Sequence, residues 1–203
     1  MAPRYERRKT YIVNDVPDEW PPALWRRRDV PGYESSRILW RDTGWQLDGA
    51  AVLAYEGSAC RLDYVIAANR QWVTQSAVVS GWVGTRVIDI TMARAASGLW
   101  SVNGTLCPAV AGCVDVDLNF SPSTNLFPIR RLGLSIGQTA AVQAAWLRFP
   151  TFELEPLQQT YTRIAEGVYR YESSGGRFVA EVTVDAQGLV LDYGEIWSRE
   201  VPA

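Results

Sequence analysis

Hydrophobic and polar residues alternate along much of the chain, with the period of two that is typical of half-buried β-strands. The clearest case lies at residues 114–120, where four apolar side chains alternate with Asp115, Asp117 and Asn119. A Ser-Pro-Ser-Thr-Asn turn follows, and two adjacent arginines, Arg130 and Arg131, come after it. We therefore expect a strand that ends in a tight turn, with acids before the turn and guanidinium groups after it.

The same alternation recurs before and after this segment, with turn residues between the runs. Asn103-Gly104 separates two of these runs and is the strongest short hairpin signal. The runs lie at residues 37–41, 45–55, 60–68, 72–83, 85–94, 99–102, 105–107, 138–149, 161–164, 167–172, 177–184 and 188–193. A flat sheet rarely carries so many strands. The pattern predicts a mostly β fold, with one strongly curved antiparallel sheet forming a closed or nearly closed β-barrel around an apolar interior.

Helix signals are few, because no segment shows a long period of 3.6 residues. Only Pro128–Ile136 and Glu153–Gln159 have room for a helical turn or two, so we expect less than a fifth of the chain to be helical. Residues 34–203 are predicted to form one β-barrel-like domain. Residues 1–33, rich in proline and arginine, are predicted to form an N-terminal arm.

Two interpretations of this arm remain open. Termini are commonly loose, which favours a flexible leader. However, Trp20 and Trp25 are unusual in a disordered tail, which favours an arm packed over the barrel. In that second interpretation Trp20–Tyr33 lies across one mouth of the barrel as a lid.

Composition narrows the function. The chain has 203 residues, 47% of them hydrophobic, with a net charge of −2. This balance argues against a nucleic-acid-binding surface. Histidine is absent, which excludes Ser-His-Asp and Cys-His catalysis and histidine zinc sites. We expect no cofactor and no metal, since the Asp-x-Asp-x-Asn run lacks the downstream glycine and glutamate of a calcium loop.

Location and redox state follow from the same composition. No apolar run approaches the ~18 residues of a membrane span, so stable membrane insertion is not expected. The charged N-terminus has no apolar run after it, so a secretory leader peptide is not expected. The cysteines are odd in number and do not suggest a disulfide framework; they are Cys60, Cys107 and Cys113. We predict a cytoplasmic protein with free thiols. The sequence leaves the oligomeric state open.

One long spaced pattern resembles the signature of the putative glycolipid-binding family of bacterial proteins. It reads Gly112-Cys113-x-Asp115-x-Asp117-Leu118-x-x-Ser121-Pro122-x-Thr124-Asn125-x-x-Pro128-Ile129-Arg130-Arg131-Leu132. Further matches are Trp72-Val73-Thr74-Gln75-Ser76-Ala77, Trp100-x-x-Asn103-Gly104, Ala144-Ala145-Trp146-Leu147-Arg148-Phe149-Pro150, Tyr169-Arg170-Tyr171-Glu172 and Asp192-Tyr193 with Trp197. The resemblance covers roughly residues 36–199. It implies a mostly β fold similar to bacterial carriers that hold lipid in a curved sheet.

Aromatic side chains form the first candidate site. A barrel of about eight or more strands leaves space for a ligand, and wide aromatic side chains suit an apolar one. An ordinary aromatic core is the alternative. The candidate ligand-binding residues are Trp40, Tyr64, Trp72, Trp82, Trp100, Trp146, Tyr169, Tyr171 and Trp197.

The charged segment forms the second candidate site. Its members, which suit either a polar head group site or a structural network of ion pairs, are Asp115, Asp117, Arg130 and Arg131. The structural network is the favoured interpretation, because the opposite charges share one local segment. Asp115 and Asp117 lie two residues apart and are also a catalytic carboxylate pair in a weaker hypothesis. Tyr64 and Tyr169 are the other weak catalytic candidates.

Three functions remain open at this stage. The leading hypothesis is the binding of a large, mostly apolar small molecule, such as a lipid, glycolipid or polyketide, in the barrel interior. The second is a cofactor-independent cyclase of natural-product biosynthesis, which folds a flexible polyene for pericyclic or ring-closing chemistry without histidine or metal. The third is a structural or partner-binding domain.

Overall fold

The computed structural model describes residues 20–200, and its strands belong to one 15-stranded sheet, which confirms a mostly β fold. The first eight strands are β1 (Ala23–Arg27), β2 (Gly32–Arg41), β3 (Gly44–Tyr55), β4 (Ser58–Asn69), β5 (Thr74–Val83), β6 (Arg86–Arg94), β7 (Trp100–Val102) and β8 (Thr105–Cys107). The others are β9 (Asp115–Leu118), β10 (Thr139–Arg148), β11 (Glu153–Ala165), β12 (Val168–Ser173), β13 (Phe178–Val184), β14 (Val190–Tyr193) and β15 (Trp197–Glu200). One α-helix, α1 (Leu126–Leu132), lies between β9 and β10.

The strand order shows how the sheet is assembled. It runs β8-β7-β6-β5-β4-β3-β2-β1-β15-β14-β13-β12-β11-β10-β9. Neighbours are antiparallel except β9 and β10, which are parallel. The joint between the two halves is the β1–β15 pair, in which Leu24 opposes Glu200 and Arg27 opposes Trp197. The first and last strands of the described chain therefore meet in the middle of the sheet.

The predicted closure into a barrel is not found, since β8 and β9 remain the two edges of the ladder. The β9 end is instead attached to the opposite half by a few hydrogen bonds. Thr74 N–H donates to the Val114 carbonyl at 3.3 Å, and the Cys113 carbonyl accepts from Arg94 Nε and Trp100 Nε1, both at 2.9 Å. Local contacts thus hold the edges near each other without a continuous strand pair.

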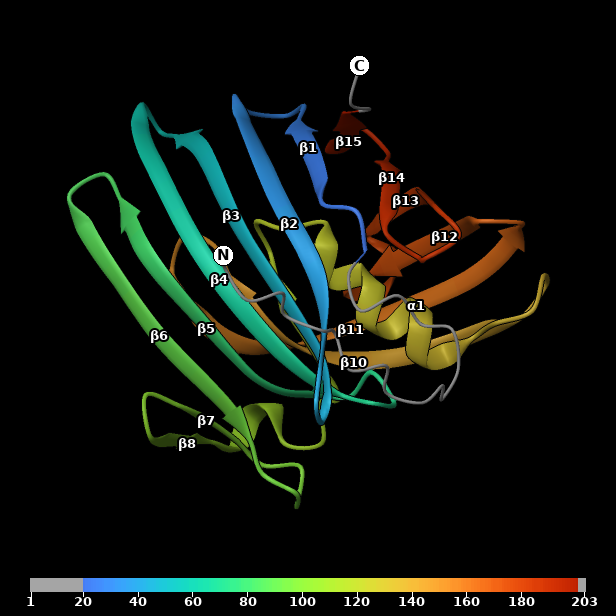
Figure 1. Cartoon of the computed structure of the whole chain (residues 1–203), viewed down its shortest axis with the longest axis horizontal. Coiled ribbons are helices and arrows are strands. Elements are labelled where there is room, and N and C mark those ends of the chain that lie inside the picture. The colour runs from blue at the N-terminus through green and yellow to red at the C-terminus, as the bar shows by residue number, and fades with distance from the viewer. Residues whose placement is uncertain (1–19, 201–203) are drawn as a thin grey trace, which may run out of the picture.

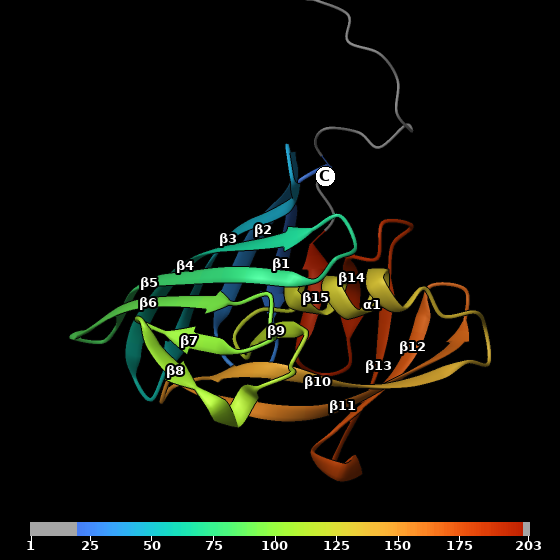
Figure 2. The same cartoon turned by 90° about the horizontal axis from the view of Figure 1, so that it is seen from below.

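The sheet wraps around α1, which lies between β1–β5 and the β10–β14 half in both views (Figures 1 and 2). Pro128 is tolerated at the third helical position because the N–H groups of the first turn have no intrahelical acceptor. The helix ends at Gly133, whose φ of 53° is the left-handed conformation of a common C-terminal cap. This segment overlaps the predicted helical stretch 128–136.

Helix α1 divides the interior into two packed cores. Leu126 and Phe127, both 0% exposed, pack with the apolar faces of β2–β6. Ile129 packs instead with β11–β14, against Tyr161 and Tyr171 among others. Because the helix occupies the concave side of the sheet, much of the interior expected to be open is filled by its side chains.

The part of the expected N-terminal arm that the structure describes joins the sheet at Ala23, where β1 begins, rather than standing apart from it. Trp25 is fully buried in β1 and donates its indole N–H to the Val190 carbonyl at 2.7 Å. Trp20 is buried against Trp45, with ring centroids 5.4 Å apart. Tyr33 is half exposed in β2. The expected division at residue 33/34 and the lid formed by 20–33 are thus replaced by a strand that joins the two halves; residues 1–19 lie outside the described residues.

Two local predictions have opposite outcomes. The hairpin at Asn103-Gly104 is confirmed, since both residues have positive φ (48° and 80°) between β7 and β8, as a type I′ turn requires. The helical turn expected at Glu153–Gln159 is wrong, because this segment is the first part of β11 and pairs with β10. Burial alternates along its second half, where Leu157, Gln159 and Tyr161 are more buried than the residues between them, which is the period of a strand.

Cys60, Cys107 and Cys113 are all free thiols, in agreement with the prediction. Burial raises the pKa of the Cys113 thiol to about 11, with the charge of Asp115 adding to the rise, so this thiol stays protonated at neutral pH. Among the helices of the described residues, none is both long and apolar enough to cross a membrane.

Candidate functional site

A buried carboxyl group, Glu34, connects three separate parts of the fold. Glu34 is 0% exposed on β2, and its Oε1 atom accepts hydrogen bonds from Tyr64 on β4 at 2.5 Å and from Ser121 after β9 at 2.8 Å. Ser123 donates to the same oxygen, and Ser36 is 3.1 Å from Ser123. The network therefore ties two strands of the sheet to the turn that precedes α1.

Backbone geometry makes room for this network. Tyr64 lies directly across from Gly49 of β3, and a Cβ atom at residue 49 would lie 2.2 Å from the Tyr64 hydroxyl. Only glycine leaves the space that the phenol ring occupies, since real Cβ contacts are never so short. Gly49 thereby allows the Tyr64 hydroxyl to reach Glu34.

The charge state of this carboxyl group is set by its burial. Burial raises the pKa of Glu34 to about 7, and the hydrogen bonds from Ser123, Tyr64 and Ser121 oppose that rise. The second carboxyl oxygen, Oε2, is buried and has no hydrogen-bond partner among residues 20–200. A group with these properties changes its protonation near neutral pH, where neither charge state is strongly preferred.

Ser121 also forms part of the wall of a cavity of about 250 Å³ on the concave side of the β10–β15 half. Polar groups enter it from β9 and the loop that follows, and aromatic rings enter from the neighbouring strands. Its lining consists of Asp117, Asn119, Ser121, Asn125, Trp146, Leu157, Tyr171, Ser173, Ser174, Phe178, Tyr193, Ile196 and Trp197. A half-polar, half-aromatic lining of this kind suits a small polar group that carries an apolar extension.

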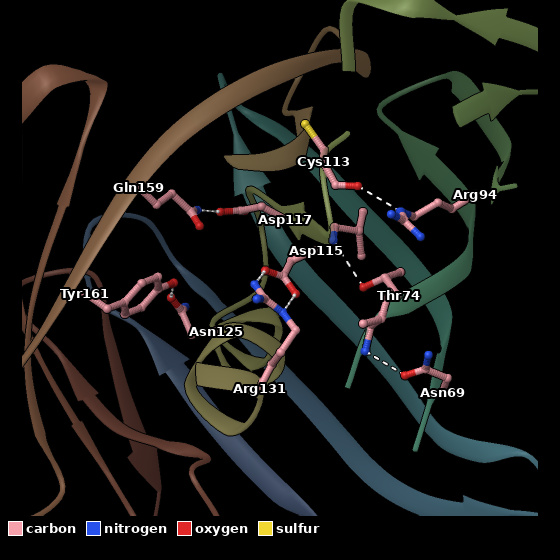
Figure 3. A network of polar contacts seen from close by, with 12 residues as sticks. Asn69, Thr74, Arg94, Cys113, Asp115, Asp117, Asn125, Arg131, Gln159 and Tyr161 are labelled. Atoms are coloured by element: carbon pink, nitrogen blue, oxygen red, sulfur yellow. Dashed lines mark hydrogen bonds and ion pairs between the residues drawn. The ribbon is translucent and has the colours of Figure 1, made fainter. Parts of the chain in front are cut away.

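Asp117 is the acidic group of this cavity. Gln159 on β11 donates to its Oδ2 atom at 2.6 Å (Figure 3). Desolvation of the carboxylate by the surrounding side chains raises the pKa of Asp117 to about 6. The hydrogen bond from Gln159 opposes this rise, and the negative charge of the nearby Asp115 adds to it. At neutral pH Asp117 is therefore mainly a carboxylate, which accepts hydrogen bonds from hydroxyl groups.

The tyrosines beside Asp117 keep their protons. Burial raises the pKa values of Tyr161, Tyr171 and Tyr193 above the ordinary range, and the negative charge of Asp117 adds to each rise. Tyr171 lies edge-on to Tyr161 at 5.1 Å and to Tyr193 at 5.7 Å between ring centroids. Tyr161 donates to the Asn125 side chain at 2.8 Å (Figure 3). The cavity thus presents phenol hydroxyls as neutral hydrogen-bonding groups.

Asp115 has a different role from Asp117, although the two lie two residues apart on β9. Arg131 of α1 holds Asp115 with both Nε and Nη2, in a two-pronged ion pair (Figure 3). Burial raises the pKa of Asp115, and Arg131 opposes that rise. Only 2% of the Asp115 side chain is exposed. This pair joins α1 to the edge strand, and Asp115 has no position in the wall of the cavity.

The structure brings together only part of the residue set expected from the sequence. The cavity is lined by four of them, Asp117, Trp146, Tyr171 and Trp197. Tyr64 lies behind the cavity wall, where its hydroxyl accepts a hydrogen bond from Ser121. Arg130 does not join Arg131 in the acidic network; its guanidinium lies over the rings of two tryptophans.

The remaining expected aromatic residues lie elsewhere. Trp72 stacks on Trp45 at 4.4 Å, with the half-buried Trp40 edge-on to Trp45. Trp100 is fully buried at the Cys113 carbonyl, and Trp82 is 40% exposed on the outer face. Tyr169 lines a different cavity, described below. These residues pack the protein or face solvent, and do not form one continuous apolar chamber.

A larger hollow of about 420 Å³ lies on the opposite, outer side of β2–β5. Its floor includes the exposed side chains of Ser35, Val65 and Ser80. Ser36 and Tyr64 of the buried Glu34 network also border it, but their hydroxyl groups are engaged with Ser123 and Glu34. The inner cavity, although smaller, is therefore the stronger candidate.

Glu34 and Gln159 are the important residues that sequence reasoning missed. Glu34 shares a strand face with Ser36 and Ile38, so the period of two, extended backward from residue 37, places Glu34 inside. The expected domain boundary at residue 34 hid this signal. Gln159 fell within the segment assigned to a helical turn, where its contact with β9 could not be anticipated.

Comparison with known proteins agrees with this architecture. A sequence profile of the family described as "Putative glycolipid-binding" matches residues 22–199. The chain belongs to the putative glycolipid-binding family. The matched region begins before β1, earlier than the resemblance at 36–199 suggested, and includes Glu34 and the whole cavity lining.

A solved structure extends this relationship. A DUF1089 family protein from Pseudomonas aeruginosa is 31% identical and superimposes with a TM-score of 0.74, over 96% of this chain and 100% of that chain. No curated protein matches the sequence. The chain is therefore similar to that protein in sequence as well as in overall fold.

Proposed function

We propose that this protein binds an amphipathic lipid, with a sugar head group in the cavity around Asp117. The observation that supports the proposal most strongly is the convergence of aromatic rings and polar groups in that cavity, from Trp146, Tyr171 and Asp117. A sugar ring has apolar C–H faces and a rim of hydroxyl groups. The rings suit the faces, while the Asp117 carboxylate and the protonated phenols suit the rim. The family description supports the same class of ligand.

The cavity size limits how the ligand is held. About 250 Å³ is below the range of ~300–1,000 Å³ that encloses drug-sized molecules, so a long lipid tail cannot lie wholly inside. In this proposal the head group enters the cavity, and the tail leaves past the half-buried apolar side chains of Leu157, Phe178 and Ile196. A fully enclosed apolar ligand, the leading hypothesis from the sequence, is thus replaced by one that is only partly enclosed.

The other two hypotheses gain no comparable support. A cyclase requires an enclosed apolar chamber that folds its substrate, whereas α1 fills the space between the two halves of the sheet with Leu126, Phe127 and Ile129. A structural or partner-binding role does not account for protonated phenols and a carboxylate converging on one cavity. The head group proposal uses these groups directly.

A pair of detergents with matched tails tests the proposal. Octyl β-glucoside and an octyl poly(ethylene glycol) ether share a tail, and only the glucoside carries a sugar. Calorimetric titration below the micellar concentrations should show saturable binding of the glucoside and much weaker binding of the ether. Equal binding of both would refute recognition of the sugar.

Two tryptophan variants locate the site in the same assay. Trp146→Ala removes a ring from the cavity wall, while Trp82→Ala removes an exposed ring from the outer face and is the matched control. We expect Trp146→Ala to weaken glucoside binding about tenfold, since a lost aromatic contact is worth roughly 1–3 kcal/mol. Binding that survives in Trp146→Ala and disappears in Trp82→Ala would place the site on the outer face.

A further inference from the structure

A second cavity, of about 200 Å³, lies between the end of α1 and the turns that connect β11 to β12 and β13 to β14. Two arginines and a tyrosine reach it from three different elements: Arg130 from α1, Arg163 from β11 and Tyr169 from β12. We propose that this cavity binds an oxyanion of the phosphate class. The proposal does not rest on the sugar site around Asp117.

When the charged residues of this cavity are counted together with their ion-pair partners, there is one more cation than there are anions. Glu166 also lines it, but is paired with Arg163 at 2.8 Å. Asp185 lines it too, and is paired with Arg199. None of the ion pairs among residues 20–200 includes Arg130, whose side chain is exposed. A bound anion would supply the missing counter-charge to Arg130.

The guanidinium of Arg130 is held in a defined position. It lies 5.4 Å from the ring centroid of Trp72 and 5.6 Å from that of Trp20. Its side-chain stem passes Gly188, where an added Cβ atom would lie 3.3 Å from Arg130 Cδ. Contacts of this kind reduce the conformational freedom that a long side chain loses when it binds an anion.

Arg163 provides an unused hydrogen-bond donor. Its Nη1 donates to the Leu134 carbonyl at 2.9 Å and its Nη2 to Glu166, while its buried Nε has no acceptor within the described part of the chain. The ladder between β11 and β12 is irregular just after Arg163, as expected where a strand turns a side chain toward a site. Guanidinium donors bind phosphate oxygens well because their N–H groups diverge in one plane.

Tyr169 completes the set as a neutral donor. It is 5% exposed, and burial raises the pKa of its phenol, with the positive charges of Arg163 and Arg130 opposing the rise. The phenol therefore keeps its proton at neutral pH and is close enough to both guanidinium groups to feel their charge. One free cation, one buried donor and one phenol in a small cavity match the size and acceptor pattern of an oxyanion.

The site lies apart from the sugar cavity. Tyr169 and Tyr171 are both buried on β12, but Tyr169 lines the basic cavity and Tyr171 the acidic one. The packed side chains of Tyr161, Val182 and Val190 belong to the core between them. Failure at one site therefore does not imply failure at the other.

Inorganic phosphate is the direct probe, measured by calorimetric titration on the full chain at low ionic strength, with tryptophan fluorescence as a second signal from Trp20 and Trp72. We expect saturable binding to the parent protein. Arg130→Gln should weaken it about tenfold or more, because the free guanidinium makes a charge-assisted contact. Arg70→Gln is the matched control, since Arg70 is also exposed and lies 5.5 Å from a tryptophan ring, Trp40, outside the cavity.

A second variant separates binding from folding. Tyr169→Phe removes only a hydroxyl group and should retain the parent melting temperature while weakening phosphate binding several-fold. Dihexanoyl phosphatidylglycerol below its micellar concentration distinguishes a lipid phosphate from free phosphate; binding of either that is lost in Arg130→Gln supports the site. No saturable binding of either to the parent, or equal binding in Arg130→Gln and Arg70→Gln, overturns the proposal.

Discussion

Replacing Glu34 with glutamine should remove a large part of the dependence of stability on pH. In the unfolded chain Glu34 titrates near 4.5, whereas in the folded protein burial raises its pKa to about 7. Between these two values the folded protein keeps a proton that the unfolded chain has lost. The contribution of Glu34 to the free energy of unfolding is therefore fully present below pH 4.5 and is lost as the pH rises through 7.

The magnitude follows from the difference between the two pKa values. A difference of about 2.5 pH units corresponds to about 3 kcal/mol in the free energy of unfolding. The full value applies because Glu34 is 0% exposed, so solvent does not screen it. Glutamine retains an oxygen that accepts from Tyr64 and the serines, but its amide N–H groups occupy the place of the unpartnered Oε2 and cost roughly 1–3 kcal/mol at all pH values.

Urea unfolding followed by tryptophan fluorescence measures this free energy at pH 5, 6, 7 and 8. We expect the parent to lose stability most steeply between pH 5 and 7 and to level off by pH 8, and Glu34→Gln to lose much less. Asp117, whose pKa burial raises to about 6, contributes in the same direction at the acidic end of the range. Glu153→Gln, at an exposed glutamate, is the control and should follow the parent. If Glu34→Gln keeps the parental slope between pH 6 and 8, Glu34 is not the titrating group.

Three further predictions concern stability. Arg131→Ala leaves the Asp115 carboxylate buried without its partner and should lower the free energy of unfolding by about 3–5 kcal/mol in urea; a parental midpoint would contradict the structural role of the pair. Gly49→Ala places a methyl group against Tyr64 and should cost about 1–3 kcal/mol, so an unchanged melting temperature would contradict the geometry. Deleting residues 1–33 removes β1 from the middle of the sheet, and circular dichroism should show loss of the native fold rather than a folded protein with weaker binding.

Local features were predictable because neighbouring residues determine them. The Asn103-Gly104 turn requires only two residues that tolerate positive φ. Asp115 and Arg131 are close in the chain, so a turn between them was enough to suggest their ion pair. The alternation of apolar and polar residues likewise identified most of the strands, since it depends only on which face is buried.

Features that depend on distant partners were not predictable. The place of β1 depends on β15, near the other end of the described residues, and its own sequence ends in two arginines that resemble a solvated segment. The filling of the interior depends on where α1 docks, which no local pattern specifies. The different surroundings of Asp117 and Asp115 similarly depend on their partners, Gln159 and Arg131, which come from different elements.

The pairing of β1 with β15 has a consequence for how the protein is made. Arg27 and its partner Trp197 are 170 residues apart in the chain. At about 5–20 residues per second, a ribosome takes on the order of 10–30 s to add the segment between them. During that time the unpaired edge of β1, with the buried face of Trp25 beside it, has no strand to cover it. The nascent chain must therefore be protected from intermolecular strand pairing until β15 has left the ribosome.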